Sequence, residues 1–230
     1  MTQYFSGPCP ICGGSTFTFA TVLWPELVDA WQLADYETDY INRQQGVACT
    51  GCHNNLRTMA LAAAILRRYA QGGTLAAFCD SGAAVDLVEI NTAGNLTSTL
   101  RKLTGHRLVE YPEYDMMNLS IASGSVDLVV HSDTLEHIPI PSRALSECRR
   151  ILRAGGCCIF TVPVVVDRLT RSRDGLVPSY HGQSGVPAHD QVVFSEFGAD
   201  FWKCVLAAGF SSCEIFCLEY PSALAIVAEK

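Results

Sequence analysis

From Ala84 onward, the sequence alternates between strand-like and helix-like runs, and this alternation constrains the fold more than any other feature. Consecutive parallel strands need crossover helices, so the pattern predicts an α/β fold with a doubly wound, mostly parallel sheet. Strands are expected at residues 84–90, 106–111, 125–132, 157–165, 211–220 and 223–229, and helices at 54–73, 95–103, 142–156 and 197–210.

Four of the eleven cysteines form two closely spaced pairs. Cys9 and Cys12 lie in CPICGG, and Cys49 and Cys52 lie in CTGCHN. Each pair suits a tight knuckle, and two knuckles complete a tetrahedral site with no open position, so the sequence predicts a structural zinc ion. Four free thiols, a redox pair, or His53 in place of one cysteine are the alternatives.

This pattern divides the chain into a zinc-binding module at residues 1–55, a linking helix at 56–80 and the sheet domain at 81–230. The first segment is too short to build a good core alone, and a metal is the usual remedy. An aromatic-rich insert at 24–46 either packs on the main domain or lines the mouth of a substrate site.

Charge and hydropathy narrow the classes of partner. A net charge of -7 repels phosphate backbones, which argues against nucleic acid. No apolar run approaches the roughly 18 residues that span a bilayer, so we expect no membrane partner. The start, MTQYFSGPCP, lacks the features of a signal peptide, which predicts a cytoplasmic protein without a disulfide framework. The chain could assemble as a homodimer.

The run SVDLVVHSDTLEHIPIPSRALSECRRILRAGGCCIFTVP carries a family resemblance. From about Ala83 to Lys230, the chain resembles class I S-adenosylmethionine-dependent methyltransferases, with the fourth strand, the LEH segment and the turn into the fifth strand in the family's order. The resemblance implies a Rossmann-like methyltransferase fold with a seven-stranded-type sheet, behind a small N-terminal zinc ribbon. It also implies S-adenosylmethionine as cofactor. A nicotinamide dehydrogenase would share this fold, but the LEH and RILRAGG runs point elsewhere.

The cofactor loop departs from the family's pattern. The resemblance places Glu89 at the acidic end of the first strand, and it places Asn91, Ala93 and Asn95 where the family has glycines, with Gly94 one residue out of phase. Asparagine is the next best residue for a left-handed backbone, and alanine adds only a Cβ atom. The loop is therefore altered but not blocked.

The next segment supplies further expected cofactor contacts. Glu110 lies 21 residues after Glu89, a spacing that suits an acceptor for ribose hydroxyls. By resemblance, Asp115 would accept from the adenine amino group and Met116 would pack on the ring, although Met116 also suits an ordinary core. The run from Glu110 to Asp115 is so short that one helix of the standard fold is expected to be missing.

Five polar residues are candidates for the reaction itself or for its immediate surroundings. Ligands gather at the carboxyl ends of strands, which places His131 as a candidate base and Ser132 near the cofactor. The resemblance places His137 close to the pocket. His181 and His189 lie in the long loop that covers the acceptor in many family members. Each could instead be an ordinary structural or surface residue.

The sequence thus predicts methyl transfer from S-adenosylmethionine to a polar small molecule, such as a sugar or a specialised metabolite. The methylated atom (O, N or C) is left open. A non-catalytic methyltransferase-like protein with a degenerate cofactor loop is one alternative. A zinc-ribbon RNA methyltransferase is another, which the acidic composition disfavours.

Overall fold

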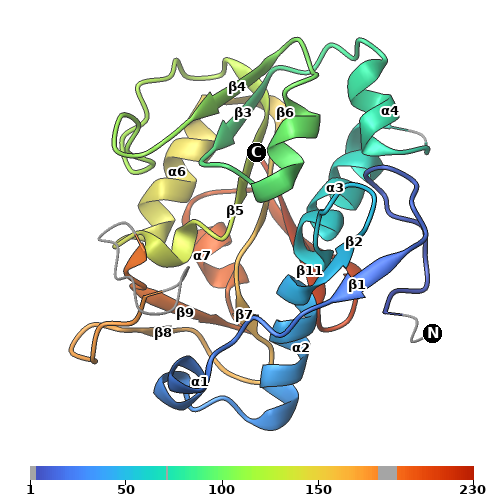
Figure 1. Ribbon diagram of the computed structural model, residues 1–230. Coiled ribbons are helices and arrows are strands. Elements are labelled where there is room, and N and C mark those ends of the chain that lie inside the picture. The colour runs from blue at the N-terminus through green and yellow to red at the C-terminus, as the bar shows by residue number, and fades with distance from the viewer. Residues whose placement is uncertain (1–3, 71, 181–190) are drawn as a thin grey trace.

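The computed structural model describes residues 4–70, 72–180 and 191–230. At its centre is a six-stranded sheet with the order β10-β11-β6-β5-β3-β4 (Figure 1). Strands β4, β3, β5 and β6 are mutually parallel, whereas β11 runs antiparallel to both of its neighbours. The strands are β3 (Leu87–Ile90), β4 (His106–Val109), β5 (Val126–Ser132), β6 (Leu152–Thr161), β10 (Ser212–Glu219) and β11 (Ala223–Glu229).

The predicted doubly wound, mostly parallel sheet is confirmed, with six strands where the resemblance implied a seven-stranded type. The difference lies between β4 and β5. Residues 110–125 connect these strands without a helix or strand of their own. Each parallel crossover normally needs a dozen or more residues, so this segment suffices for one connection and has no room for a further strand with a crossover of its own. The expected loss of one standard helix is confirmed.

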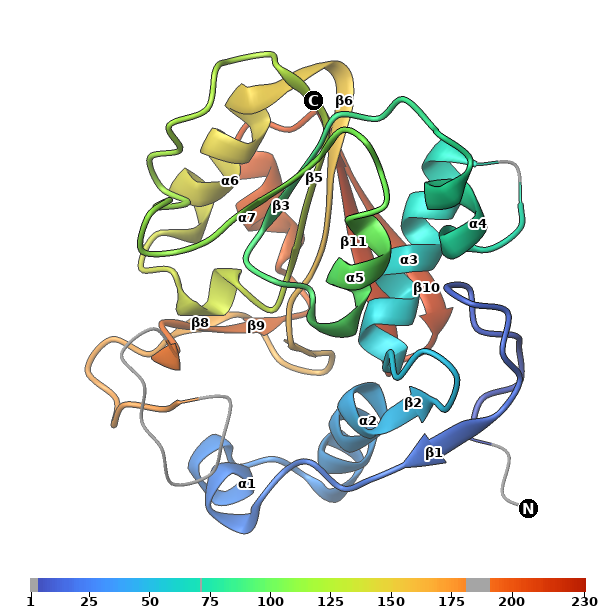
Figure 2. The ribbon, with the colours of Figure 1, turned by 45° about the horizontal axis from the view of Figure 1, so that its top comes forward.

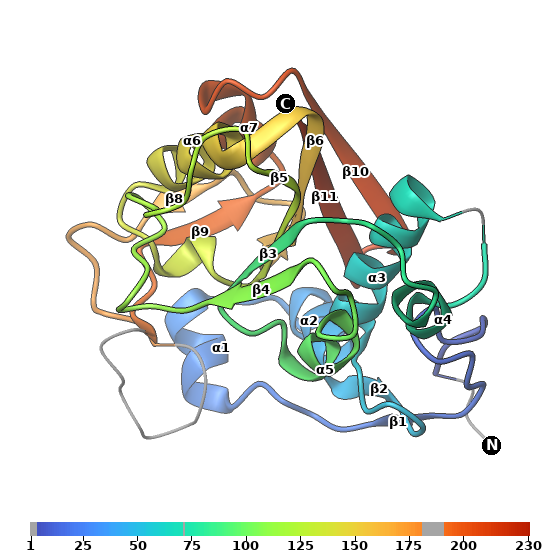
Figure 3. The same cartoon turned by 90° about the horizontal axis from the view of Figure 1, so that it is seen from above.

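Helices cover both faces of the sheet, as Figure 3 shows. Successive residues of a strand point to opposite faces. Leu87 and Leu128 therefore join the core on one side, and Val88 and Val129 join the core on the other. The first face is covered by α3 (Leu56–Tyr69), α4 (Leu75–Asp80) and α5 (Thr97–Leu100), and the turn η1 (Gly94–Leu96) precedes α5. The second face is covered by α6 (Pro141–Ile151) and α7 (Trp202–Ala207).

The first long helix, α3, connects the N-terminal segment to the sheet. It begins after Asn55, whose side chain accepts a hydrogen bond from the Thr58 backbone N–H at 3.1 Å and caps the helix. Its apolar face, including Met59, Leu61 and Ile65, is fully buried in the first core. The expected run, 54–73, begins with a capping asparagine, as observed at Asn55, but the helix ends earlier than expected, at Tyr69.

The N-terminal segment folds around a small antiparallel pair of strands, β1 (Phe17–Phe19) and β2 (Val47–Cys49). Two helices, α1 (Pro25–Trp31) and α2 (Asp35–Gly46), connect them, and α2 lies below α3 and α5 in Figure 2. Apolar side chains of this segment, such as Ile11 and Val47, belong to the same buried cluster as Leu87 of the sheet. The segment and the sheet therefore share one core.

The stretch after β6 was expected to be a loop, and it contains a three-stranded sheet in the order β7-β9-β8. Its strands are β7 (Val164–Val165), β8 (Arg171–Ser172) and β9 (Ser195–Gly198). Because β9 uses Phe197 and Gly198, the helix expected at 197–210 is reduced to α7. His181 and His189 lie outside the described residues. Among the described helices, none has the length and apolar character to cross a bilayer.

Candidate active site and cysteine cluster

One large cavity, of about 1130 Å³, lies at the carboxyl ends of β3, β4 and β5. In a doubly wound sheet this edge is where ligands bind. The opposite wall comes from α1 and α2 of the N-terminal segment and from the start of α3. Ligand pockets of roughly 300–1,000 Å³ hold one drug-sized molecule, so this cavity has room for a cofactor and a small acceptor together.

The loop after β3, which lacks glycines implied by the resemblance, adopts a left-handed backbone at Asn91 and Gly94. Asn91 lines the cavity and has a φ of +54°, in the left-handed region. Its side-chain oxygen accepts a hydrogen bond from the Tyr111 backbone N–H at 3.1 Å, which ties β3 to the end of β4. Gly94 has a φ of +59°, and a Cβ atom there would meet open space. The loop thus retains two left-handed residues.

Glu89 supports this loop from behind. Its side chain is fully buried and does not line the cavity. It accepts hydrogen bonds from the Ala93 backbone N–H at 2.8 Å and from the Thr97 hydroxyl at 2.6 Å, and it lies 2.7 Å from the His106 ring nitrogen. Ala93 is itself buried and is not among the residues that line the cavity. Glu89 and Ala93 therefore shape the loop and lie behind its cavity side.

Changing Asn91 to alanine is expected to lower the free energy of unfolding by about 1–2 kcal/mol, because a Cβ-bearing residue without a local hydrogen bond is strained at a positive φ. Asn91→Gly should cost less than 1 kcal/mol, since glycine adopts this backbone freely. Urea denaturation would measure both. Asn118→Ala is the matched control, because Asn118 is exposed and outside the left-handed region. Equal losses for Asn91→Ala and Asn91→Gly would contradict the strain argument.

The next three predicted cofactor residues all lie at the cavity. Glu110 follows β4, and Asp115 and Met116 come from the loop beyond it. Met116 is buried, whereas both carboxylates are exposed. The Asp115 carboxylate accepts a hydrogen bond from the Met117 backbone N–H at 2.8 Å. Asn91, Glu110 and Asp115 therefore lie along one side of the same cavity.

His131 and Ser132 are placed away from this cavity. His131 is fully buried and stacks on Phe160, with 4.6 Å between ring centroids. Neither ring nitrogen has a hydrogen-bond partner among the described residues, and burial lowers the pKa of His131 to about 3. Ser132 is also buried, and its hydroxyl lies 2.8 Å from the Thr161 hydroxyl. The strand continues through both residues, so they lie inside the sheet, and His131 has no access to a substrate.

The end of β5 is held by a polar cluster that the sequence did not reveal. Asp133, with a φ of +46°, forms an ion pair with Arg57 at the start of α3. It also accepts hydrogen bonds from the Gln45 side-chain amide at 3.0 Å and from the Thr161 hydroxyl at 3.2 Å. Asn55 in turn donates to the Gln45 side-chain oxygen at 3.2 Å. Arg57, Gln45 and Asp133 all line the cavity.

The predicted residue His137 lines the cavity beside Glu136, a residue that the sequence did not single out. Both belong to the short turn η2 (Leu135–His137). The His137 Nδ1 atom lies 3.0 Å from the Val192 carbonyl oxygen, which can only accept, so Nδ1 carries a proton. Burial, followed by the charge of Asp133, raises the pKa of Glu136 well above its usual range.

The aromatic insert lines the cavity and also packs on the main domain. Trp24, Leu27 and Trp31 of the α1 region line the cavity, and α1 packs against Val165 and Val193. The Trp31 indole N–H donates to the Ser179 hydroxyl at 2.8 Å. The two roles considered for the insert therefore occur together.

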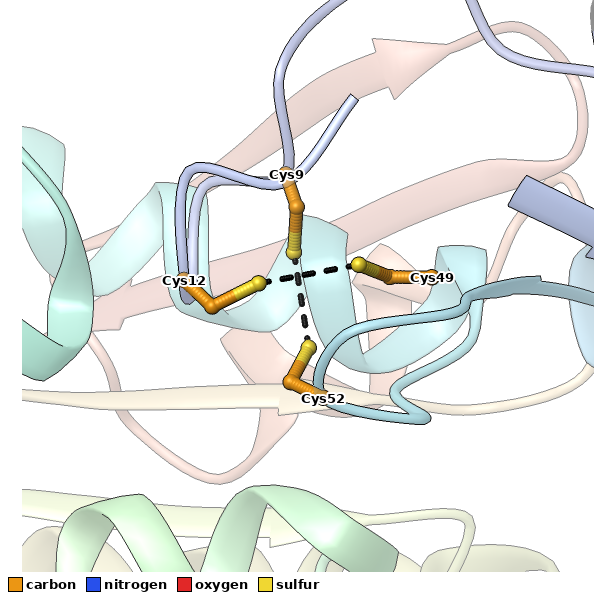
Figure 4. Close-up of side chains that lie close together, drawn as sticks. All are labelled: Cys9, Cys12, Cys49 and Cys52. Atoms are coloured by element: carbon orange, nitrogen blue, oxygen red, sulfur yellow. Dashed lines mark hydrogen bonds between the residues drawn. The ribbon is translucent and has the colours of Figure 1, made fainter. Parts of the chain in front are cut away.

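The four paired cysteines converge on one point, as Figure 4 shows. All four Sγ atoms lie within 4.8 Å of one another, and the Cys9–Cys52 and Cys12–Cys49 pairs are each 3.6 Å apart. A tetrahedral zinc ion with Zn–S bonds of about 2.3 Å sets sulfur atoms about 3.8 Å apart, so the cluster fits this metal. Burial raises the pKa of the Cys9 thiol, so its ionised form needs a nearby cation.

Residues 69–160, which include β3 to β5, η2 and most of β6, match the family described as a methyltransferase domain. This chain contains a methyltransferase domain. The match confirms the expectation of an S-adenosylmethionine-dependent methyltransferase. The methyltransferase domain supplies one side of the cavity, whereas Gln45, Arg57 and the two tryptophans precede the matched residues.

Several solved structures are similar to the chain at low sequence identity. A SAM-dependent methyltransferase from Thermotoga maritima is 16% identical, with 68% of this chain and 87% of that chain covered and a TM-score of 0.37. A SAM-dependent methyltransferase from Aquifex aeolicus is 12% identical, with 63% and 81% covered and a TM-score of 0.38. PigF with SAH is 20% identical, with 67% and 46% covered and a TM-score of 0.40. No curated protein matches the chain.

Proposed function

We propose that the protein transfers a methyl group from S-adenosylmethionine to a polar group of a small molecule. One observation carries this proposal. A single cavity joins the carboxyl edge of the methyltransferase domain to the tryptophans of the N-terminal insert. Bound S-adenosylmethionine supplies an electrophilic methyl group, and the protein's main task is to align the acceptor with it.

In this proposal the cofactor occupies the side formed by the predicted contacts. Glu110 accepts hydrogen bonds from the ribose hydroxyls, Asp115 receives the adenine amino group, and Met116 packs on the ring. Asn91 brings the backbone close to the methionine end. These assignments are supported by the shared cavity position of all four residues and by the left-handed backbone at Asn91.

The acceptor would then lie between η2 and the helices of the insert. Trp24 and Trp31 offer flat apolar surfaces, which suit a sugar ring or an aromatic metabolite, while Glu136 and His137 offer polar contacts. Arg57 is the single lysine or arginine among the described residues that line the cavity, and it is paired with Asp133. This acidic lining favours a small molecule over the phosphate backbone of RNA.

We also propose that the cysteine cluster holds a structural zinc ion through Cys9, Cys12, Cys49 and Cys52. The four sulfur atoms leave no position for a water molecule or a substrate, which supports a structural role. The ion would fix the loop between β2 and α3.

The test of methyl transfer is the formation of S-adenosylhomocysteine when the purified protein is given S-adenosylmethionine and a panel of hydroxylated and amine-bearing metabolites. Mass spectrometry would follow both products. A wild-type protein that binds no S-adenosylmethionine in calorimetry would overturn the proposal.

Glu110→Ala is expected to weaken the binding of S-adenosylmethionine roughly tenfold to a hundredfold. The reason is that a charge-assisted hydrogen bond to the ribose is worth on the order of 1.5–3 kcal/mol. Isothermal titration calorimetry would measure the affinity. Glu113→Ala is the matched control, since Glu113 lies three residues away, is exposed and is not part of the cavity lining. An unchanged affinity in folded Glu110→Ala would remove Glu110 from the cofactor site.

A further inference from the structure

The carboxyl group of Glu136 is the most unusual polar group of the cavity. Its side chain is 1% exposed, and neither carboxyl oxygen has a hydrogen-bond partner among the described residues. An unpaired buried carboxylate is costly, so proteins seldom keep one without a use. Glu136 nevertheless lines the cavity. Glu136 is therefore part of the cavity lining although its side chain is almost entirely buried.

The turn that carries Glu136 is held in place from two sides. The backbone oxygen of Glu136 accepts a hydrogen bond from the Phe194 backbone N–H at 2.7 Å, and the His137 ring contacts the Val192 carbonyl. These contacts involve the backbone of Glu136 and the neighbouring ring, and they leave the Glu136 carboxyl unengaged. The two contacts thus fix the turn, and with it Glu136, beside the cavity.

Three charged or titratable groups face this carboxyl. Asp133 repels its ionised form, and Arg57 favours that form but is already paired with Asp133. The His137 Nε2 atom lies 3.7 Å from a Glu136 oxygen, beyond hydrogen-bond distance. Together with burial, this environment favours the neutral acid in the free protein. A cation or a proton donor that enters the cavity would change this balance.

We propose that Glu136 faces the point of methyl transfer and receives the proton of the acceptor's O–H or N–H group, an inference that rests on the proposed function. The acceptor's oxygen or nitrogen lone pair forms the bond to the methyl carbon. The sulfur–methyl bond breaks with its electron pair remaining on sulfur. The proton of the acceptor moves to the Glu136 carboxylate and later leaves to water. For this step Glu136 must first be ionised.

The test uses two ligands that differ at the position of the transferred methyl group. S-adenosylhomocysteine is neutral there, and sinefungin carries an ammonium group in place of the methylsulfonium. Calorimetry at pH 7 in buffers of different ionisation enthalpy measures affinity and proton release. The proteins compared are wild type, Glu136→Gln and the exposed control Glu113→Gln.

If Glu136 faces the methyl position, the sinefungin ammonium will ionise it. Sinefungin binding should then release more protons from wild type and Glu113→Gln than from Glu136→Gln. Its affinity should fall about tenfold in Glu136→Gln, whereas the affinity for S-adenosylhomocysteine should change less than twofold. Equal losses for both ligands would indicate a structural role and overturn the proposal, as would no effect on either. If wild type binds neither ligand, the proposed function itself fails.

Turnover offers a second measurement once an acceptor is found. A base is active only when ionised, so wild-type kcat/KM should rise with pH through the raised pKa of Glu136. Glu136→Gln should lower kcat about 100-fold and lose this step in the pH profile. A pH profile that is identical in both proteins would overturn the proposal.

Discussion

Simultaneous replacement of Cys9 and Cys49 by serine should abolish metal binding and lower the free energy of unfolding by roughly 5 kcal/mol or more. Structural zinc sites contribute on the order of 10 kcal/mol in small metal-dependent domains, which is comparable to the whole stability of many proteins. Each cysteine knuckle would lose one of its two thiolates. Elemental analysis should find about one zinc ion per wild-type chain and none in the double variant.

A single Cys217→Ser change is the matched control, because Cys217 is exposed and lies outside the cluster. It should leave zinc content and stability unchanged. Zinc that survives the double replacement, or wild-type protein purified without chelator that contains no zinc, would contradict the assignment of the cluster to this metal.

Replacing Arg57 by methionine is expected to cost about 2–4 kcal/mol of stability. Methionine keeps much of the side-chain volume, but it leaves the largely buried Asp133 carboxylate without its cation. Adding Asp133→Asn should recover part of the loss, because the uncompensated charge is then removed. Urea denaturation of the two single variants and the double variant would give the coupling energy between the residues.

Arg67 provides a matched control on the same helix. It pairs with Glu214 at 2.8 Å, but both side chains are largely exposed. Arg67→Met should therefore cost about 0.5 kcal/mol or less. A similar cost for Arg57→Met and Arg67→Met would mean that the Arg57–Asp133 pair contributes no more than a surface ion pair.

The sheet could be predicted from sequence because its strands are short apolar runs bounded by turns, and this signal is local. The number of strands also follows from a local quantity, the few residues between Glu110 and Ser125. The site was harder, since it depends on contacts between distant segments. Gln45 and Arg57 lie 88 and 76 residues before Asp133, and hydrophobic periodicity carries no signal of contacts over such separations.

Some signals for the site were nevertheless present. Arg57 lies in the first turn of a helix, where the helix dipole disfavours a positive charge. This position indicates that its side chain pairs with a group outside the helix. Glu136 lies within the LEH run that carried the family resemblance. His131 was placed at the site because it is polar near a strand end. The strand ends at Ser132 as predicted, but the His131 ring is completely buried and stacks on Phe160.

The knuckle from Cys49 to Cys52 lies between Gln45 and Arg57, and both of these residues bind Asp133 at the far wall. This arrangement limits the modularity of the chain. A transplant of residues 81–230 alone would carry the sheet and the cofactor loop without the tryptophans, the arginine and the glutamine that close the cavity. The segment that carries the cysteine cluster therefore forms part of the cavity wall, and it cannot be exchanged independently of the sheet.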